Sequence, residues 1–218
     1  LNTTGIKEGL SNWQFPLVFL DFETANPAIP RYIGCTPYQH VPFQFSVHIW
    51  NDPESDLEHH EFLWTTLTDP RPSLIPALLK ACGKQGSIVA YYSLFEAGRI
   101  EELAEFAPEY AEDLLALNQR LVDPLPIIRN NIYDNAFEGS FSLKKVASAL
   151  LGQAHSYDNM VVANGGDAQR AFEAIITNSI SENEKQALIK ALLEYCKKDT
   201  LEVVELVKWL YQQVNMLE

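Results

Sequence analysis

The stretch Leu17-Val18-Phe19-Leu20-Asp21-Phe22-Glu23-Thr24 places two carboxylates at the end of an apolar run. The apolar residues predict a buried strand over residues 17–23. Side chains two residues apart in a strand share a face, so Asp21 and Glu23 are expected to point the same way. Two carboxylates at so short a distance repel each other unless a cation lies between them. The alternative is a strand that ends at Leu20, with both carboxylates in solvent.

Around this strand, the chain predicts an α/β fold. Further strands are expected at residues 43–50, 58–65 and 87–92, and a short strand or turn at 121–128. Helices are expected at residues 72–82, 95–107, 108–120, 142–151, 167–178 and from 181 onward. Three successive strands favour an antiparallel meander, and the later alternation of strand and helix favours parallel additions. We therefore expect a mixed sheet flanked by helices, in a single domain over residues 1–218.

Composition restricts the class of protein. With 218 residues and 47% hydrophobic residues, the chain is long and apolar enough for one sizeable core. No apolar run reaches the roughly 18 residues of a membrane span, and no signal peptide is expected. Three widely spaced cysteines suit reduced thiols in a cytoplasm. The chain does not begin with Met, so we expect a domain taken from a longer protein.

A second acidic position lies in the last helix. Ser181-Glu182-Asn183-Glu184 has the form of a capping box that opens this helix. One helical stripe then follows at spacings of three and four residues; its members are Leu188, Leu192, Tyr195, Asp199, Val203, Leu206 and Leu210. A carboxylate in such a stripe is costly unless it is paired or binds a metal. The alternatives for Asp199 are a buried Arg or Lys partner, or a groove at that point.

Glu96 is the fourth acidic candidate. It follows the predicted strand at residues 87–92, at the edge where α/β sheets place ligands. The alternative is a capping role, because Ser93-x-x-Glu96 is also a capping-box pattern. Together, four carboxylates would provide the hard oxygen ligands that Mg²⁺ or Mn²⁺ prefers. Two such ions roughly 4 Å apart can clamp the attacking and leaving oxygens of a phosphodiester.

These residues resemble three motifs of the DEDD superfamily of 3'→5' exonucleases, which have an RNase H-like fold. The resemblance is to the branch whose third motif is Tyr-x-x-x-Asp, and it spans about residues 15–210. The matching segments are Asp21-Phe22-Glu23-Thr24, Tyr92-Ser93-Leu94-Phe95-Glu96, Tyr195-Cys196-Lys197-Lys198-Asp199, and, between the last two, Val122 to Leu125 and Gly139 to Ala147. Tyr32 to Gly34 and Pro42 to Ser46 are similar to an uncharacterised bacterial family within that superfamily.

The resemblance implies a role for each acidic residue. Asp21 would be shared by two metal ions, Glu23 and Asp199 would bind one of them, and Tyr195 would assist the attacking water. Glu96 stands where the family usually has Asp, and Tyr92 where it commonly has Asn. Asp123 is expected to have a structural role.

The expected substrate is the 3' end of single-stranded DNA or RNA, or a short oligonucleotide. The net charge of −13 counts against a long duplex, which is usually held by a basic surface. Phe22, Thr24, Tyr92 and Phe95 are the candidate substrate contacts, the aromatic ones by stacking on a base, and ordinary core packing is the alternative for each ring. Two rival functions are an inactive module that binds nucleic acid or protein, and a phosphodiesterase acting on small nucleotides.

Overall fold

A five-stranded mixed sheet forms the centre of the protein in the computed structural model, which describes residues 1–152, 155, 157 and 160–216. The strand order is β3-β2-β1-β4-β5, with β1 antiparallel to β2, β2 antiparallel to β3, and the pairs β1–β4 and β4–β5 parallel. The strands are β1 (Leu17–Ala25), β2 (Val41–Trp50), β3 (Glu58–Leu63), β4 (Ser87–Val89) and β5 (Leu121–Val122). The predicted α/β class and the mixed sheet are confirmed.

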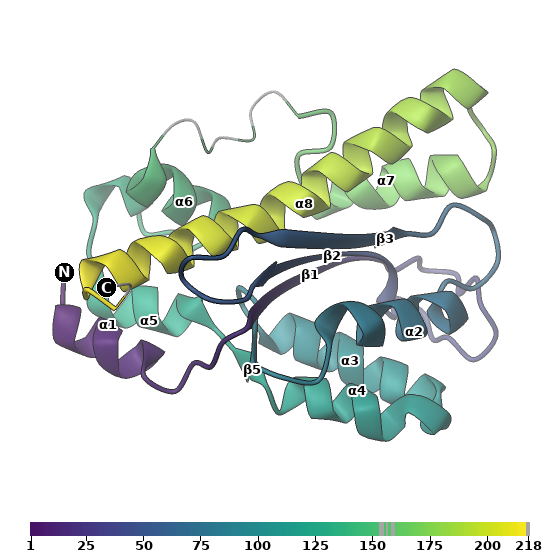
Figure 1. Ribbon diagram of the computed structural model, residues 1–218. Coiled ribbons are helices and arrows are strands. Elements are labelled where there is room, and N and C mark those ends of the chain that lie inside the picture. The colour runs from purple at the N-terminus through teal and green to yellow at the C-terminus, as the bar shows by residue number, and fades with distance from the viewer. Residues whose placement is uncertain (153–154, 156, 158–159, 217–218) are drawn as a thin grey trace.

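Helices cover both faces of the sheet (Figure 1). On one face lie α2 (Arg71–Cys82), α3 (Leu94–Phe106) and α4 (Ala111–Asn118). The long α8 (Glu182–Gln213) crosses the other face, with α7 (Gly165–Ile176) and α6 (Leu143–Leu151) packed against it. The short α1 (Thr3–Leu10) packs on α5 (Pro124–Asn131), and short 3-10 turns occupy Pro108–Tyr110 and Asn135–Phe137. Among the described residues, no helix is both long and apolar enough to cross a membrane.

The central strand β1 is buried on both faces. Val18, Leu20 and Phe22 pack into the core formed with α2, α3 and α4. Leu17 and Phe19 pack into the core on the side of α8. Because side chains alternate along a strand, Asp21 and Glu23 point toward the α8 side as well. The expectation that the two carboxylates share a face and lie within a continuing strand is therefore confirmed.

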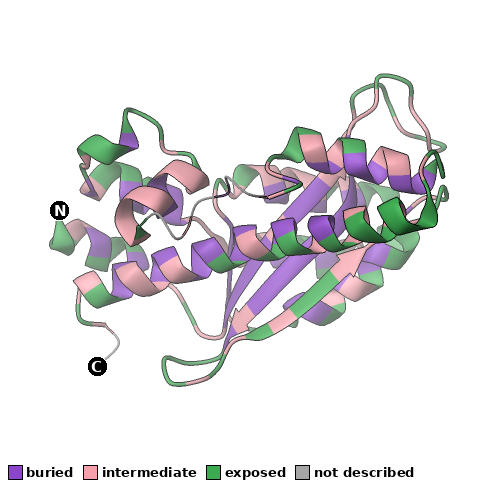
Figure 2. Ribbon diagram, turned by 90° about the horizontal axis from the view of Figure 1, so that it is seen from above, coloured by how far each residue is buried: buried purple, intermediate pink, exposed green. Residues whose placement is uncertain are grey.

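Helix α8 begins as predicted. The Ser181 side chain accepts a hydrogen bond from the Glu184 backbone N–H, and the Glu184 carboxylate accepts one from the Ser181 backbone N–H. The predicted stripe faces the protein interior, and the alternation of buried and exposed residues along α8 is visible in Figure 2. Asp199, in the middle of this stripe, is 7% exposed.

Polar side chains of β2 hold α8 against the sheet. The Gln44 amide donates a hydrogen bond of 2.8 Å to the Leu192 carbonyl. Thr200 Oγ1 lies 2.8 Å from both Ser46 Oγ and His48 Nδ1. Burial lowers the pKa of His48 to about 3, so the imidazole is neutral in this network. Since Thr200 follows Asp199, these bonds set the rotation of α8 that turns Asp199 toward β1.

Several element boundaries differ from the sequence predictions. The segment 121–128 is not one element, because β5 ends at Val122 and Pro124 opens α5, with Asp123 as its N-cap. The helix at 108–120 is a 3-10 turn followed by α4, and β4 ends at Val89. Helix α7 begins at Gly165, capped by Asn164, rather than at Asp167. Helix α1 was not predicted.

Gly86 is required by the close approach of two chain segments. Its φ is +76°, and a Cβ added there would overlap the carbonyl oxygen of Pro16. We expect Gly86→Ala to lower the free energy of unfolding by about 3 kcal/mol or more, because backbone atoms must move as well as the new methyl group. The matched control is Gly83→Ala, which has φ +56° but open space around it, and should cost about 1 kcal/mol. Equal losses in urea unfolding would contradict the steric argument.

Candidate metal centre

Four carboxylates converge from three elements at the C-terminal end of β1. Asp21 and Glu23 come from β1, Glu96 from the first turn of α3, and Asp199 from the middle of α8. Ligand atoms of Asp21, Glu23 and the Cys196 thiol all lie within 4.8 Å of one another. The charges of Asp199 and Glu96 both act on Asp21 and on Glu23. All four predicted acidic residues are thus close enough to interact.

Burial and mutual repulsion make this cluster unfavourable without a cation. Burial, followed by the charge of Asp199, raises the pKa of Glu23 to about 8. Burial raises the pKa of Glu96 to about 8 as well. Asp21, which is enclosed by the other carboxylates, has a pKa well above its usual range for the same reasons. A divalent cation at this point would replace the missing solvation and remove the repulsion.

Two oxygens of the cluster have no hydrogen-bond partner in the described part of the chain: Asp199 Oδ1 and Glu96 Oε2. Both belong to buried side chains, which normally have their polar atoms paired. Unpaired carboxylate oxygens are suitable ligands for Mg²⁺ or Mn²⁺, and the donor set here is dominated by hard oxygens. The residues present therefore fit such an ion. A buried Arg or Lys ion pair, the alternative for Asp199, does not occur within the described ranges.

Glu96 does not cap α3. The Ser93 side chain makes no capping hydrogen bond, so the capping-box reading of Ser93-x-x-Glu96 is wrong. Instead, the Asp123 carboxylate accepts hydrogen bonds from the backbone N–H groups of Tyr92 (3.2 Å) and Ser93 (2.9 Å), and from Leu125 at 2.8 Å. Asp123 therefore connects the start of α3 to the start of α5, which is the structural role expected for it. The Glu96 carboxylate does not take part in a capping box.

Two tyrosines and a lysine surround Asp199. Lys144 Nζ donates to the Ala163 carbonyl and, at 3.4 Å, to Tyr195 Oη. It also lies 4.5 Å from the ring centre of Tyr157. Its charge lowers the pKa values of Glu23 and Asp199, although burial outweighs this effect and both pKa values are raised. Burial and the neighbouring carboxylates raise the pKa of Tyr195, so its hydroxyl keeps its proton.

Cavities open on two sides of the cluster, and Asp21, Tyr195 and Asp199 line both. The first has a volume of about 410 Å³ and is also bordered by Glu23, Thr24, Phe95, His40 and the first turn of α7. The second has a volume of about 250 Å³ and extends toward Tyr91 and the start of α6. Asp21 and Asp199 therefore lie between the two cavities, which together are called the cleft, and Glu23 borders the first. Glu96 is 3% exposed and lines neither cavity.

The four residues predicted to contact substrate do not all lie at the same cavity. Thr24 and Phe95 line the first cavity, and Thr24 Oγ1 lies 2.8 Å from His40 Nδ1. Phe22 borders the same cavity, but it is 4% exposed and its side chain packs in the core on the opposite face of β1. A ring held there cannot stack on a base, and the expectation for Phe22 is corrected. Tyr92 lines neither of the two cavities and contacts a third one.

Three residues of the site were not identified as site residues from the sequence. Cys196 Sγ lies 3.6 Å from Asp21 Oδ2, and a cysteine within a helix carries no signal of such a contact. Tyr157 itself is in neither a helix nor a strand, and its Oη has no hydrogen-bond partner among the described residues. His40 belongs to the loop between β1 and β2, which the sequence marks only as a segment suited to recognition. No periodic pattern distinguishes Tyr157 or His40 from ordinary loop residues.

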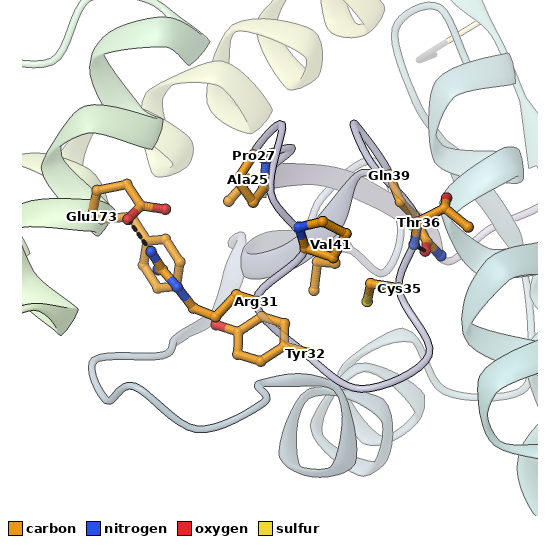
Figure 3. Close-up of a pocket in the computed structure, with 11 residues that line it drawn as sticks. Ala25, Pro27, Arg31, Tyr32, Cys35, Thr36, Gln39, Val41 and Glu173 are labelled. Atoms are coloured by element: carbon orange, nitrogen blue, oxygen red, sulfur yellow. Dashed lines mark hydrogen bonds and ion pairs between the residues drawn. The ribbon is translucent and has the colours of Figure 1, made fainter.

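The loop between β1 and β2 is attached to α7 through Arg31 and Glu173 (Figure 3). Arg31 Nη2 donates to Glu173 Oε2 at 2.6 Å. Tyr32 Oη and Glu173 Oε1 are buried without a hydrogen-bond partner among the described residues, and both residues border a cavity of about 10 Å³. The attachment holds the loop that carries His40 in place beside the first cavity.

The fold and the site together define an α/β protein with a cluster of four carboxylates at the C-terminal end of its central strand. Residues 18–142 match the family described as "Domain of unknown function (DUF2779)", and the chain belongs to this family. The matched region contains Asp21, Glu23 and Glu96, while Tyr195 and Asp199 lie beyond it.

One curated relative is similar over most of the chain. The "Uncharacterized protein MG366 homolog" of Mycoplasma pneumoniae is 26% identical over 199 residues, which cover 84% of this chain. The match spans 30% of the length of that relative. No solved structure matches the chain.

Proposed function

We propose that this protein is a metal-dependent 3'→5' exonuclease with an RNase H-like fold, of the DEDD type with a Tyr-x-x-x-Asp motif. The observation that carries the proposal is the convergence of Asp21, Glu23, Glu96 and Asp199, with Asp21, Asp199 and Tyr195 lining both cavities of the cleft. The mixed sheet, with three antiparallel strands followed by parallel additions, supports the same assignment. Four carboxylates this close destabilise the fold unless a cation is bound. A module that only binds nucleic acid or protein gains nothing from such a cluster.

Asp21, Glu23, Glu96 and Asp199 would hold two Mg²⁺ or Mn²⁺ ions. Such ions supply an activated water and stabilise the charge that develops on a phosphodiester. Asp21, on which the charges of all three other carboxylates act, would be the ligand shared by the two ions. The raised pKa values of Glu23 and Glu96 mean that metal uptake near pH 7 must displace protons from these side chains.

Tyr195 is suited to orient the attacking water. Its hydroxyl oxygen accepts a hydrogen bond from Lys144, which leaves its O–H group to donate within the cleft. Because burial and the carboxylates raise the pKa of this phenol, it acts as a hydrogen-bond donor rather than as a general base.

Tyr195→Phe should lower kcat about 10- to 100-fold, since one oriented hydrogen bond to the water is lost. The rise in Tm caused by Mn²⁺ should stay close to that of the wild type, because no carboxylate is changed. Tyr211→Phe is the matched control on the same helix, and it should leave kcat unchanged. A Tyr195→Phe enzyme with wild-type kcat would exclude a role for the hydroxyl.

The net charge of −13 is compatible with a nucleic-acid substrate of limited length. Two divalent ions add four positive charges at the point where the phosphate must bind. The strand end needs only a few contacts near the cleft, where the Lys144 side chain lines the second cavity. Binding of a short strand end does not require long-range attraction by a basic surface, which a long duplex usually needs.

The test is degradation of a 5'-labelled single-stranded oligonucleotide, as DNA and as RNA, in Mn²⁺, Mg²⁺ or EDTA. We expect metal-dependent shortening from the 3' end, abolished in EDTA and in Asp21→Asn. The matched control Asp56→Asn changes an exposed acid in the β2–β3 turn and should retain activity.

Activity that survives EDTA would disprove the proposal. Folded protein that binds the strand without cutting it would support the binding module instead. Turnover of dinucleotides alone would support the small-nucleotide phosphodiesterase.

A further inference from the structure

The cleft continues beyond the acidic cluster into a third cavity. This cavity has a volume of about 610 Å³ and shares Tyr91, Ser142 and Leu143 with the second cavity. The second cavity in turn shares Asp21, Tyr195 and Asp199 with the first. The three cavities therefore lie next to one another, with Asp21 and Asp199 bordering both the first and the second, and we call this row of cavities the groove.

The third cavity differs chemically from the rest of this acidic protein. None of the described residues that line it is acidic. Arg129, on the exposed side of α5, makes no ion pair or side-chain hydrogen bond with any described residue. Its guanidinium carbon lies 5.7 Å from the ring centre of Phe141. An unpaired Arg in a cavity whose described lining has no carboxylate is complementary to an anionic ligand, and the guanidinium group suits phosphate.

Aromatic side chains line the same cavity as Arg129. Tyr92 is 56% exposed, although most large apolar rings in the protein are buried. Phe141 is held by the Tyr91 hydroxyl, which donates a 2.7 Å hydrogen bond to its carbonyl. Phe141 itself is half-buried against the core, so Tyr92 offers the exposed ring. An exposed ring beside a cation is a combination that binds single-stranded nucleic acid, by stacking on bases and contacting the backbone.

The backbone of Tyr92 is held in an uncommon conformation that presents its ring to the groove. Its φ is +64°, a left-handed value that is rare for a bulky residue. The Asp123 carboxylate fixes this turn through the backbone N–H groups of Tyr92 and Ser93. A strained residue kept in place by a dedicated carboxylate, with its ring in solvent, indicates a binding role for that ring.

We propose that the third cavity binds a second nucleotide of a single strand whose scissile phosphate lies at the acidic cluster. Tyr92 and Phe141 would contact the base, and Arg129 the phosphate that follows. This inference rests on the proposed function, and it assigns the substrate class as an oligonucleotide longer than the unit that fills the first cavity.

The test measures binding separately from cleavage. A 5'-fluorescein (dT)₈ strand is titrated by fluorescence anisotropy in Ca²⁺, with every variant placed in an Asp21→Asn background so that no strand is consumed. Arg129→Gln should weaken binding about 10-fold at low salt, and the slope of log Kd against log salt should fall by about 0.7 for one lost phosphate contact. Tyr92→Gly should also weaken binding about 10-fold, because a stacking ring is removed.

Matched controls separate the groove from general effects. Lys84→Gln removes one positive charge from a side chain that is 87% exposed, at the turn between α2 and β4. Tyr38→Gly removes an exposed ring at φ +62° in another loop. Both controls should bind (dT)₈ like the background protein.

The outcomes distinguish this inference from the proposed function. If Arg129→Gln and Tyr92→Gly bind (dT)₈ as tightly as the two controls, the groove assignment is overturned, even if the wild type is a metal-dependent exonuclease. If both variants bind weakly and the wild type cuts no strand in Mg²⁺ or Mn²⁺, the groove assignment stands and the exonuclease proposal fails.

Discussion

Asp199→Asn is expected to abolish strand cleavage, with a loss of at least about 1,000-fold in kcat/KM. The reason is that Asp199 presents an unpaired, buried oxygen to the site where metal is proposed to bind. An amide is a neutral and much weaker ligand, and loss of several kcal/mol of charge stabilisation corresponds to about three powers of ten in rate.

The same substitution should stabilise the metal-free protein. Asp199 is buried, and its charge acts on both Asp21 and Glu23. Removing one like charge from the cluster should raise the free energy of unfolding in EDTA by about 1–2 kcal/mol, since an uncompensated buried charge is costly.

Activity assays and thermal unfolding of the same preparations in EDTA check both parts. Glu194→Gln, one turn earlier on α8 and exposed, is the matched control and should alter neither quantity. An Asp199→Asn protein that is less stable than wild type in EDTA would show that the carboxylate has a structural partner and would contradict the metal-site argument.

Metal binding should produce the second large effect, a rise in Tm that depends on pH. At 100 times the dissociation constant, a ligand specific for the folded state contributes about 2.7 kcal/mol. For a chain of this length, that corresponds to a rise of about 5–10 °C in Tm. Mn²⁺ and Mg²⁺ should both produce it, and EDTA should reverse it.

The sign of the pH dependence follows from the raised pKa values. Glu23 and Glu96 titrate near 8 in the folded metal-free protein, against 4.5 when unfolded. The stability that protonation provides is complete below pH 4.5 and is lost as the pH rises through about 8. Metal competes with these protons, so its apparent affinity should increase over the same window.

The Mn²⁺-induced rise in Tm should therefore be several degrees larger at pH 8.5 than at pH 6. Calorimetry in two buffers of different ionisation enthalpy should detect proton release on binding at pH 7. In Glu23→Gln, both the pH dependence and the proton release should shrink. Equal rises in Tm at the two pH values would contradict the assignment of protonated carboxylates to the metal-free cluster.

Much of the fold was predictable because its signals are local. The apolar run at residues 17–23 and the alternating residues at 43–50 both form strands. The capping box at Ser181 and the stripe through Asp199 define the start and the inner face of α8. Predictions failed at short elements, such as α1 and the β5–α5 junction, where few residues carry any periodic pattern.

The acidic site was predictable only in part. Asp21, Glu23 and Asp199 stood out because charged residues lay in apolar patterns. The alternatives for Glu96 and Phe22 could not be decided from the sequence. The structure decides against the cap for Glu96, through the hydrogen bonds of Asp123, and against stacking for Phe22, through the face of β1 on which it lies.

The sequence by itself determined the α/β class, the shared face of Asp21 and Glu23, and the inward face of α8, because the periods of strands and helices depend only on neighbouring residues. The tertiary structure decided which of these faces meet. The bonds from Ser46 and His48 to Thr200 turn Asp199 toward β1 across more than 150 residues of chain. The Asp123 carboxylate likewise joins the starts of α3 and α5, which bring Tyr92 and Arg129 to the same cavity. Such contacts between distant segments leave no periodic trace in the sequence, since they depend on how whole elements pack.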